Sequence, residues 1–224
     1  MKVMLLGATG LTGGKVLERL LANDRVSSVV APVRREIALT HEKLEQHEMD
    51  FDRIREHGEL FAVDVIICCL GTTIKKAGSP EQFRKVDYGY PLKAAELGRA
   101  NGVKAFILMS AIAASSSSKV FYNRVKGDLE ESVKALGFPL LSIYQPSLLL
   151  GERDESRTAE ALGMKAMPLV NRALIGPLER FRAIEADIVA GAMVNEVCGL
   201  SLDQDSGPDV RVHEYPDIVA LAKA

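Results

Sequence analysis

The sequence has few cysteines, no long hydrophobic run and no block of like charge. It contains three cysteines, two of them adjacent in "VDVIICCL". Neighbouring residues of a strand point to opposite faces, so Cys68 and Cys69 are poorly placed for a disulfide, and Cys198 is distant along the chain. We therefore expect buried, reduced thiols.

Charge and hydropathy exclude several kinds of partner. The 28 basic and 30 acidic residues leave a formal net charge of −2, and no run of Lys or Arg marks a nucleic-acid surface. No apolar stretch approaches the roughly 20 residues of a transmembrane helix, and glycine interrupts "MKVMLLGATG" before it could form a signal-peptide core. We expect a cytoplasmic protein without membrane or nucleic-acid partners.

Histidines do not suggest a metal centre. His41, His47 and His57 lie in one polar stretch, but they lack a ligand spacing such as HExxH. We interpret them as solvated surface side chains and expect no metal.

Short apolar runs alternate with segments of helical period from the first residue. The runs are "KVMLL", "SSVVAPV", "VDVIICCL", "VKAFILMS" and "PLLSIYQ", and most show no polar alternation, as in parallel strands covered on both faces. "GLTGGKVLERLLAN" and "YPLKAAELGRANG" are the first helical segments. This pattern predicts a doubly wound α/β parallel sheet, the Rossmann fold.

The pattern favours a single domain over residues 1–224. Residues 1–150 would form the nucleotide-binding core, and residues 151–224 a small substrate-pocket region and closing elements. "EADIVAGAMVNEV" predicts a helix there, and "VRVHEYPDIVALA" predicts one more strand and a final helix. The substrate pocket would be lined by residues 152–182, whose composition identifies no compound class.

"GATGLTG" places three glycines between the first strand and the first helix. A diphosphate needs backbone N–H groups at a helix N-terminus and a chain without Cβ atoms, which suits Gly7 and Gly10, whereas Gly13 would let helix pack closely on strand. The alternative is a purely structural turn. In this strand–turn–helix setting the motif predicts dinucleotide binding.

Two further strand ends would line the cofactor. The second run ends in Arg34 and Arg35, and guanidinium groups favour the 2′-phosphate of NADP(H), although the adjacent Glu36 could instead bind a ribose hydroxyl. "CCLGTT" brings Leu70, Gly71 and Thr72 beside the cofactor path. A simple strand-ending turn explains these three residues equally well.

"SSSSKVFYNRVKGDLE" resembles a linker at its start and a catalytic helix at its end. Four serines are typical of flexible connections, but a strand and a helix of one continuous pattern flank them here. Tyr122 and Lys126 are four residues apart and share a helix face. An ammonium group can stabilise the anion of a phenol, whose pKa is ordinarily about 10. Tyr122 would protonate a substrate oxygen and Ser110 would hydrogen-bond it; the alternative is an ordinary helix surface.

With these motifs, the chain resembles an atypical short-chain dehydrogenase/reductase of the branch that contains the HIV Tat-interactive protein oxidoreductases. "CLGTT", the pattern YxxxKGxxE and "ESR" carry the resemblance. It implies an NADPH-binding Rossmann fold with Tyr122 and Lys126 at the nicotinamide. The remaining cofactor contacts that it implies are Gly7, Thr9, Gly10, Leu11 and Thr12 at the phosphates, Arg34 and Arg35 at the 2′-phosphate, and Leu70 and Gly71 along the cofactor.

Two positions depart from that family pattern. The usual catalytic serine aligns with Ala111, which leaves Ser110 one position early, and Asp87 stands where many members have Asn. Two functions follow from the sequence: an NADPH-dependent reductase of a small carbonyl compound, or an NADPH-sensing binding protein with little turnover. A sugar-nucleotide epimerase is a third and more distant alternative, because only about a hundred residues follow Lys126 and little of that stretch resembles a separate substrate lobe. The apolar positions of residues 121–137 could serve a homodimer or the monomer core.

Overall fold

A seven-stranded parallel sheet is the main element of the computed structural model, which describes residues 1–151, 171, 174–201 and 207–224. The strand order is β3-β2-β1-β4-β5-β6-β9, and β7 pairs with β8 separately. The predicted doubly wound sheet is confirmed. The strands are β1 (Lys2–Leu6), β2 (Ser28–Val33), β3 (Leu44–Glu48), β4 (Val65–Cys68), β5 (Ala105–Met109), β6 (Leu140–Tyr144), β7 (Leu149–Leu150), β8 (Ile184–Glu185) and β9 (Asp209–His213).

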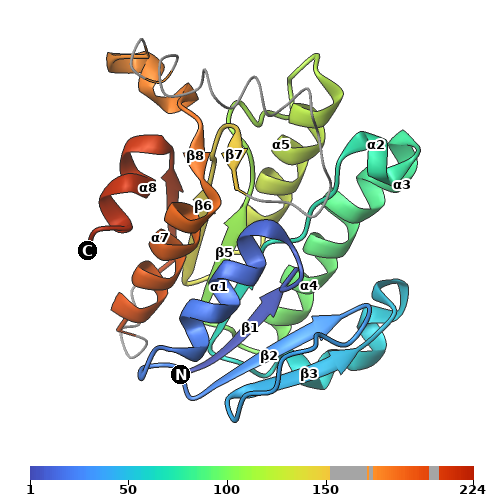
Figure 1. Cartoon of the computed structure of the whole chain (residues 1–224). Coiled ribbons are helices and arrows are strands. Elements are labelled where there is room, and N and C mark those ends of the chain that lie inside the picture. Colours follow the sequence, from blue (N-terminus) through green and yellow to red (C-terminus); the bar gives the residue numbers. More distant parts are fainter. Residues whose placement is uncertain (152–170, 172–173, 202–206) are drawn as a thin grey trace.

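Helices cover both faces of this sheet (Figure 1). One face carries α1 (Leu11–Leu21) and α7 (Ala186–Gly199) side by side, with α8 (Tyr215–Leu221) against α7. The other face carries η1 (Phe51–Phe61), α4 (Tyr90–Ala100) and α5 (Phe121–Lys134). The shorter turns are α2 (Ile74–Ala77), α3 (Pro80–Arg84), the π-helical η2 (Lys85–Gly89) and η3 (Gly176–Phe181).

Polar and apolar residues do not alternate along the central strands, because helices cover both faces of the sheet. In β1, Val3 and Leu5 pack under one layer, whereas Met4 and Leu6 pack under the other. Every strand position that faces a layer must be apolar, so alternation disappears. The edge strand β3 has the polar sequence LEQHE and is only partly buried, which explains why no apolar run marks it.

The three cysteines, Cys68, Cys69 and Cys198, are free and buried, as the sequence predicts. Burial raises the pKa of the Cys68 thiol to about 11. No helix in the described ranges is long and apolar enough to cross a membrane. The same ranges hold no cluster of three or more His, Cys, Asp or Glu side chains suited to a metal ion.

A buried carboxylate ties the last strand to the sheet. Glu196 on α7 accepts hydrogen bonds from the hydroxyls of Ser142, at 2.7 and 2.8 Å, and of Tyr144, at 2.8 Å, and lies 3.3 Å from His213 Nε2. Burial alone would raise the pKa of Glu196, but the hydrogen bonds from His213, Ser142 and Tyr144 outweigh it and hold the pKa below its usual value. The carboxylate therefore links β6, β9 and α7.

We predict that Glu196→Gln lowers the free energy of unfolding by about 2 kcal/mol near neutral pH, because an amide cannot accept all of these hydrogen bonds. A carboxyl whose pKa is lowered by folding stabilises the protein above its unfolded pKa, and this contribution disappears as the pH falls through the folded pKa. The difference between variant and wild type should therefore shrink in acid. Urea unfolding at neutral and acid pH measures it.

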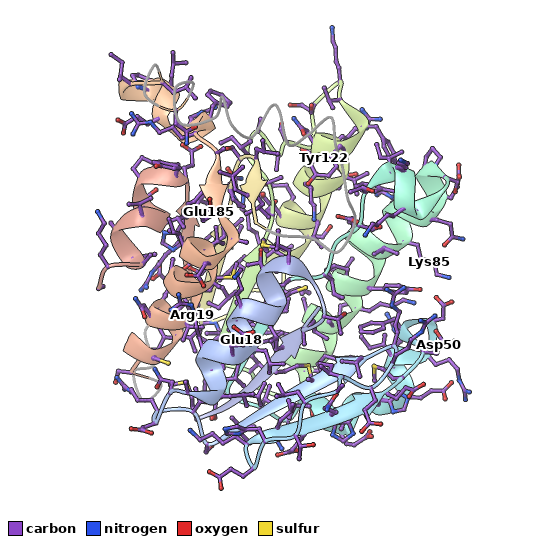
Figure 2. All side chains as sticks on the ribbon, viewed as in Figure 1. Glu18, Arg19, Asp50, Lys85, Tyr122 and Glu185 are labelled. Carbon is purple, nitrogen blue, oxygen red and sulfur yellow. The ribbon has the colours of Figure 1, made fainter. Side chains whose placement is uncertain are left out.

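Glu18→Gln is the matched control, because Glu18 lies on the exposed side of α1 (Figure 2). It should leave stability unchanged at both pH values. Equal stability of Glu196→Gln and wild type at neutral pH would contradict the role assigned to this carboxylate.

Candidate active site

The glycine turn joins the carboxyl end of β1 to α1 at the point where the strand order reverses. Gly7 has a φ of +85°, and the Gly10 N–H donates to the Gly7 carbonyl at 2.9 Å. Gly10 precedes α1 and makes no side-chain cap, so the first N–H groups of the helix have no capping side chain. A helix N-terminus of this kind attracts anions.

The fold requires glycine at two of the three motif positions and only weakly at the third. A Cβ on Gly7 would lie 2.7 Å from the carbonyl oxygen of Cys69 at the end of β4, and one on Gly13 would overlap the Gly7 carbonyl. Both glycines are needed by the fold itself. A Cβ on Gly10 would meet only the Gly7 oxygen, at 3.3 Å, so the fold gives Gly10 the weakest reason of the three.

Thr9, Leu11 and Thr12 surround this turn. Thr9 is exposed, and the Leu11 side chain lies against Gly151. Thr12 is buried, and its hydroxyl is the single buried side-chain polar atom for which the described structure gives no hydrogen-bond partner. Buried hydroxyls are ordinarily satisfied, so an unpartnered one beside a helix N-terminus suits a polar ligand.

Arg34 and Arg35 meet the glycine turn. They line an open depression of about 570 Å³ together with Thr9 and Glu36, and Arg34 also borders a neighbouring depression of about 440 Å³. The two arginines predicted to contact the 2′-phosphate therefore lie beside Thr9 of the turn. Their contact with a nucleotide stays a prediction. Glu36 lines the same depression, so either charge could contact a ribose substituent. The second depression is completed by Glu48, Met49 and Asp50.

A buried ion pair lies beneath the end of β4. Lys126 Nζ is 2.8 Å from Asp87 Oδ1, and the two side chains are 4% and 1% exposed. Asp87 Oδ2 accepts the Thr72 N–H at 2.8 Å. Gly71 covers the pair, since its Cβ would lie 3.4 Å from Asp87 Oδ1 and 3.8 Å from Lys126 Nζ. Gly71, Thr72 and Lys126 thus come together around Asp87, their common partner. Their contacts with a cofactor stay a prediction.

The charge of Lys126 is maintained by this pair. Burial lowers the pKa of Lys126, but the negative charge of Asp87 and the hydrogen bond to it raise that pKa more. The pKa therefore lies above the usual lysine value. Asp87 sits in η2, a π-helical turn between α3 and α4. Such turns are frequent at functional sites because the extra residue alters the direction of the side chains.

Tyr122 lies at the first turn of α5, the end near the carboxyl edge of the sheet (Figure 2). Its ring packs on Phe83, with ring centroids 5.5 Å apart, and is half-buried. The described residues offer its hydroxyl no hydrogen-bond partner. Tyr122 and Lys126 thus share one helix face with the phenol group available.

Ser110 makes a different contact from the one its sequence position suggests. Its hydroxyl donates to Glu130 Oε1, and Glu130 also accepts from Gln145 Nε2 at 2.9 and 3.0 Å. Ser110 and Glu130 are both buried. The predicted hydrogen bond from Ser110 to a substrate therefore competes with a protein carboxylate.

The serine run packs on α5. The Ser115 N–H donates to the Asn123 carbonyl at 3.0 Å, and Arg124 Nη1 donates to the Ser118 carbonyl at 2.8 Å. A Cβ on Gly127 would overlap the backbone of Ser115, so the loop passes directly over this glycine. The segment is consequently a packed loop of the site, whereas four serines alone would suggest a flexible linker.

Two residues of the site were not assigned roles from the sequence. Asp87 was noted only as a departure from the family pattern, and Glu130 only as part of YxxxKGxxE. Glu130 follows Lys126 by four residues, as Lys126 follows Tyr122, so helical spacing already placed all three on one face. The predicted pocket segment falls mostly on 152–170 and 172–173, and the "ESR" motif wholly so; these lie outside the described residues.

The sequence of this chain matches a known protein family and several of its members. The model of the NAD dependent epimerase/dehydratase family matches residues 3–197. Protein HTATIP2 of Rattus norvegicus is 41% identical over 167 residues, which cover 73% of this chain and 69% of the rat protein. The mitochondrial protein fmp52 of Aspergillus niger is 36% identical over 201 residues, which cover 86% of this chain and 85% of the fungal protein.

Solved structures share the fold at low identity. UDP-glucose 4-epimerase of Thermotoga maritima, solved with UDP-glucose, has a TM-score of 0.67 and 14% identity, covering 100% of this chain and 82% of the epimerase. UDP-glucuronic acid 4-epimerase of Bacillus cereus, solved with NAD, has a TM-score of 0.67 and 14% identity, with coverages of 96% and 77%. At such identities the likeness concerns the fold alone.

We predict that Gly127→Ala lowers the free energy of unfolding by about 1–3 kcal/mol, because the new methyl group must displace the backbone of the serine loop. Urea unfolding measures the loss. The matched control is Gly14→Ala on α1, where the Cβ would lie 3.6 Å from the Ala8 carbonyl, an ordinary contact. The control should keep or gain stability, by up to about 1 kcal/mol from helix propensity. Equal stability of the two variants would contradict the packed loop.

Proposed function

Because the chain belongs to the NAD dependent epimerase/dehydratase family and is a short-chain dehydrogenase/reductase relative of HTATIP2, we propose that it is an NADPH-dependent oxidoreductase of a small carbonyl compound. The observation that carries this proposal is the Asp87–Lys126 ion pair under Gly71, with Tyr122 one helical turn away. This arrangement brings a cation and a phenol to the sheet edge beside the glycine turn.

The residues present fit a dinucleotide. Gly10 leaves the approach to the N-terminus of α1 open, and the unpartnered Thr12 hydroxyl offers one hydrogen-bonding group there. The phosphates on the adenosine side of the cofactor would be held by Thr9, Arg34 and Arg35. The path from there to Lys126 would be flanked by Leu70 and Gly71. Bound NADPH would supply the hydride for reduction.

Tyr122 would provide the proton. Its O–H bond breaks as the substrate oxygen takes the proton, and the charge left on the phenolate is offset by the nearby Lys126 ammonium. An ammonium has three N–H groups, and Asp87 is the one hydrogen-bond acceptor that the described residues give Lys126. The remaining N–H groups suit a ribose hydroxyl and the Tyr122 oxygen.

The second candidate is an NADPH-sensing protein with little turnover. It is favoured by the Ser110 hydroxyl, which is directed to Glu130, and by Ala111, where a serine would complete the family pattern. Such a protein would bind NADPH tightly, oxidise none of it with a broad panel of carbonyl compounds, and change its association with a partner or a second copy when NADPH binds. Sedimentation with and without NADPH tests the last point.

The cytoplasmic location predicted from the sequence is also kept as a proposal. The fungal FMP52 relatives are mitochondrial by name. Cell fractionation decides between the two compartments.

We predict that the protein binds NADPH more tightly than NADH and that Arg34→Ala removes this preference. Loss of a hydrogen bond to a charged phosphate costs about 1.5–3 kcal/mol, or roughly tenfold or more in affinity. NADH binding should be unchanged, because NADH lacks the 2′-phosphate. Calorimetric titration of both nucleotides measures the effect.

Arg53→Ala is the control for charge, since Arg53 is exposed and pairs with Glu56 within η1. It should behave as wild type. Failure of folded wild-type protein to bind either nucleotide would refute the cofactor site, and equal affinities for the two would refute the role of Arg34.

We predict that Tyr122→Phe lowers NADPH-dependent reduction of 9,10-phenanthrenequinone, a reactive dicarbonyl probe, by about 10²–10⁴-fold, the range for loss of a general acid. NADPH affinity should stay within about twofold of wild type, because the ring remains. The matched control is Tyr88→Phe, which removes a hydroxyl that is hydrogen-bonded to Ser132 Oγ at 3.2 Å and to neither member of the ion pair. Unchanged turnover in Tyr122→Phe would sink the proposed proton donor.

A further inference from the structure

We infer that Glu130 is a positioning residue of this site, which places Tyr122 and Lys126 by fixing their helix to the carboxyl ends of β5 and β6. The inference rests on the proposed function, since it concerns how the same site is held. Glu130 lies one turn beyond Lys126 on α5, and both side chains are 4% exposed. A charged group so deeply buried requires dedicated partners.

The partners of Glu130 come from two adjacent strand ends. Ser110, just after β5, donates its hydroxyl proton to Oε1, and Gln145, just after β6, donates its amide to both carboxylate oxygens. Both donors are themselves fixed by the sheet backbone. The Ser110 N–H donates to the Tyr144 carbonyl at 2.8 Å, and the Gln145 N–H donates to the His213 carbonyl at 2.8 Å.

These hydrogen bonds set the register of α5 along its axis. A shift of the helix by one residue would move Glu130 by about 1.5 Å and turn it by about 100°, which would break every contact of its carboxylate. The same shift would move Tyr122 and Lys126 by the same amount. The position of the phenol is therefore coupled to the contacts of a carboxylate two turns away.

The single hydroxyl proton of Ser110 is used for Glu130, so Ser110 shares the role of anchoring α5. A hydroxyl has one proton, and that of Ser110 is directed to Glu130, so its oxygen can only accept from other groups while the carboxylate is charged. Burial raises the pKa of Glu130, and the hydrogen bonds from Ser110 and Gln145 lower it in part, so its pKa lies above the usual glutamate value. Ser110 thus acts with Glu130 as an anchor of α5.

The test compares Glu130→Gln with Glu131→Gln. The neighbouring Glu131 is exposed on the same helix and pairs with Lys134. Glu131→Gln therefore removes the same charge without changing any contact with the strand ends. Four quantities are measured on the full chain: hydrogen exchange of the α5 amides, NADPH affinity, and kcat and KM with NADPH and 9,10-phenanthrenequinone.

Glu130→Gln should speed exchange in α5, weaken NADPH binding through Lys126, and lower kcat by about 10²-fold, the order of loss for a misplacement of about 1 Å. KM for the quinone should change little. Ser110→Ala should lower kcat to a similar degree, and the double variant should be no worse than the more impaired single variant, because the two residues act as one unit. Glu131→Gln should match wild type throughout.

Two outcomes would overturn the inference. A loss of kcat in Ser110→Ala with normal kcat in Glu130→Gln would mean that Ser110 acts on the substrate directly. A lower unfolding free energy in Glu130→Gln with normal α5 exchange and NADPH affinity under native conditions would reduce Glu130 to a stability role. If the wild type binds NADPH but reduces no carbonyl, the proposed reductase function fails, and exchange and affinity still decide the role of Glu130.

Discussion

The ion pair between Lys126 and Asp87 is the interaction on which the rest of the site depends. Two charges buried this deeply lose their hydration, and their mutual attraction often does no more than offset that loss, so the pair contributes orientation more than stability. It joins three elements that are distant in sequence: the end of β4 through Thr72, the π-helical turn through Asp87, and α5 through Lys126. Gly71 lies over the same pair, where a Cβ would touch both charged groups, at 3.4 Å from Asp87 Oδ1 and 3.8 Å from Lys126 Nζ.

The glycine turn is constrained from the opposite side. Gly7 lies against the end of β4 and Gly13 lies against Gly7, so the first strand, the first helix and the fourth strand meet without intervening side chains. Two glycines of the motif are therefore explained by packing alone. Packing leaves three features unexplained, and these are the ones that suit a nucleotide: Gly10, the unpartnered Thr12 hydroxyl and the arginines beside Thr9.

Much of the fold could be predicted from the sequence, because parallel strands covered on both faces must be apolar throughout and the first helix shows its buried stripe openly. The strand β3 and the η1 helix could not, because β3 is a polar edge strand and η1 is a mostly polar segment in which only Phe51, Ile54 and Phe61 are buried. For the site, the spacing of Tyr122 and Lys126 was enough to predict that the two side chains share one face of a helix, as they do on α5. The contact of Asp87 was not predictable, because it depends on a π-helical turn that no local pattern marks.

The three buried or half-buried positions of α5 differ in what they leave free. Lys126 is held by Asp87, and Glu130 is held by Ser110 and Gln145. Tyr122 is held through its ring on Phe83, a contact that uses none of its polar atoms. Two turns of the helix are thus anchored by charge, whereas the third is anchored by an apolar face and keeps its hydroxyl unpaired within the described structure. An acid catalyst needs this combination, because its position must be fixed while its proton remains available to another molecule.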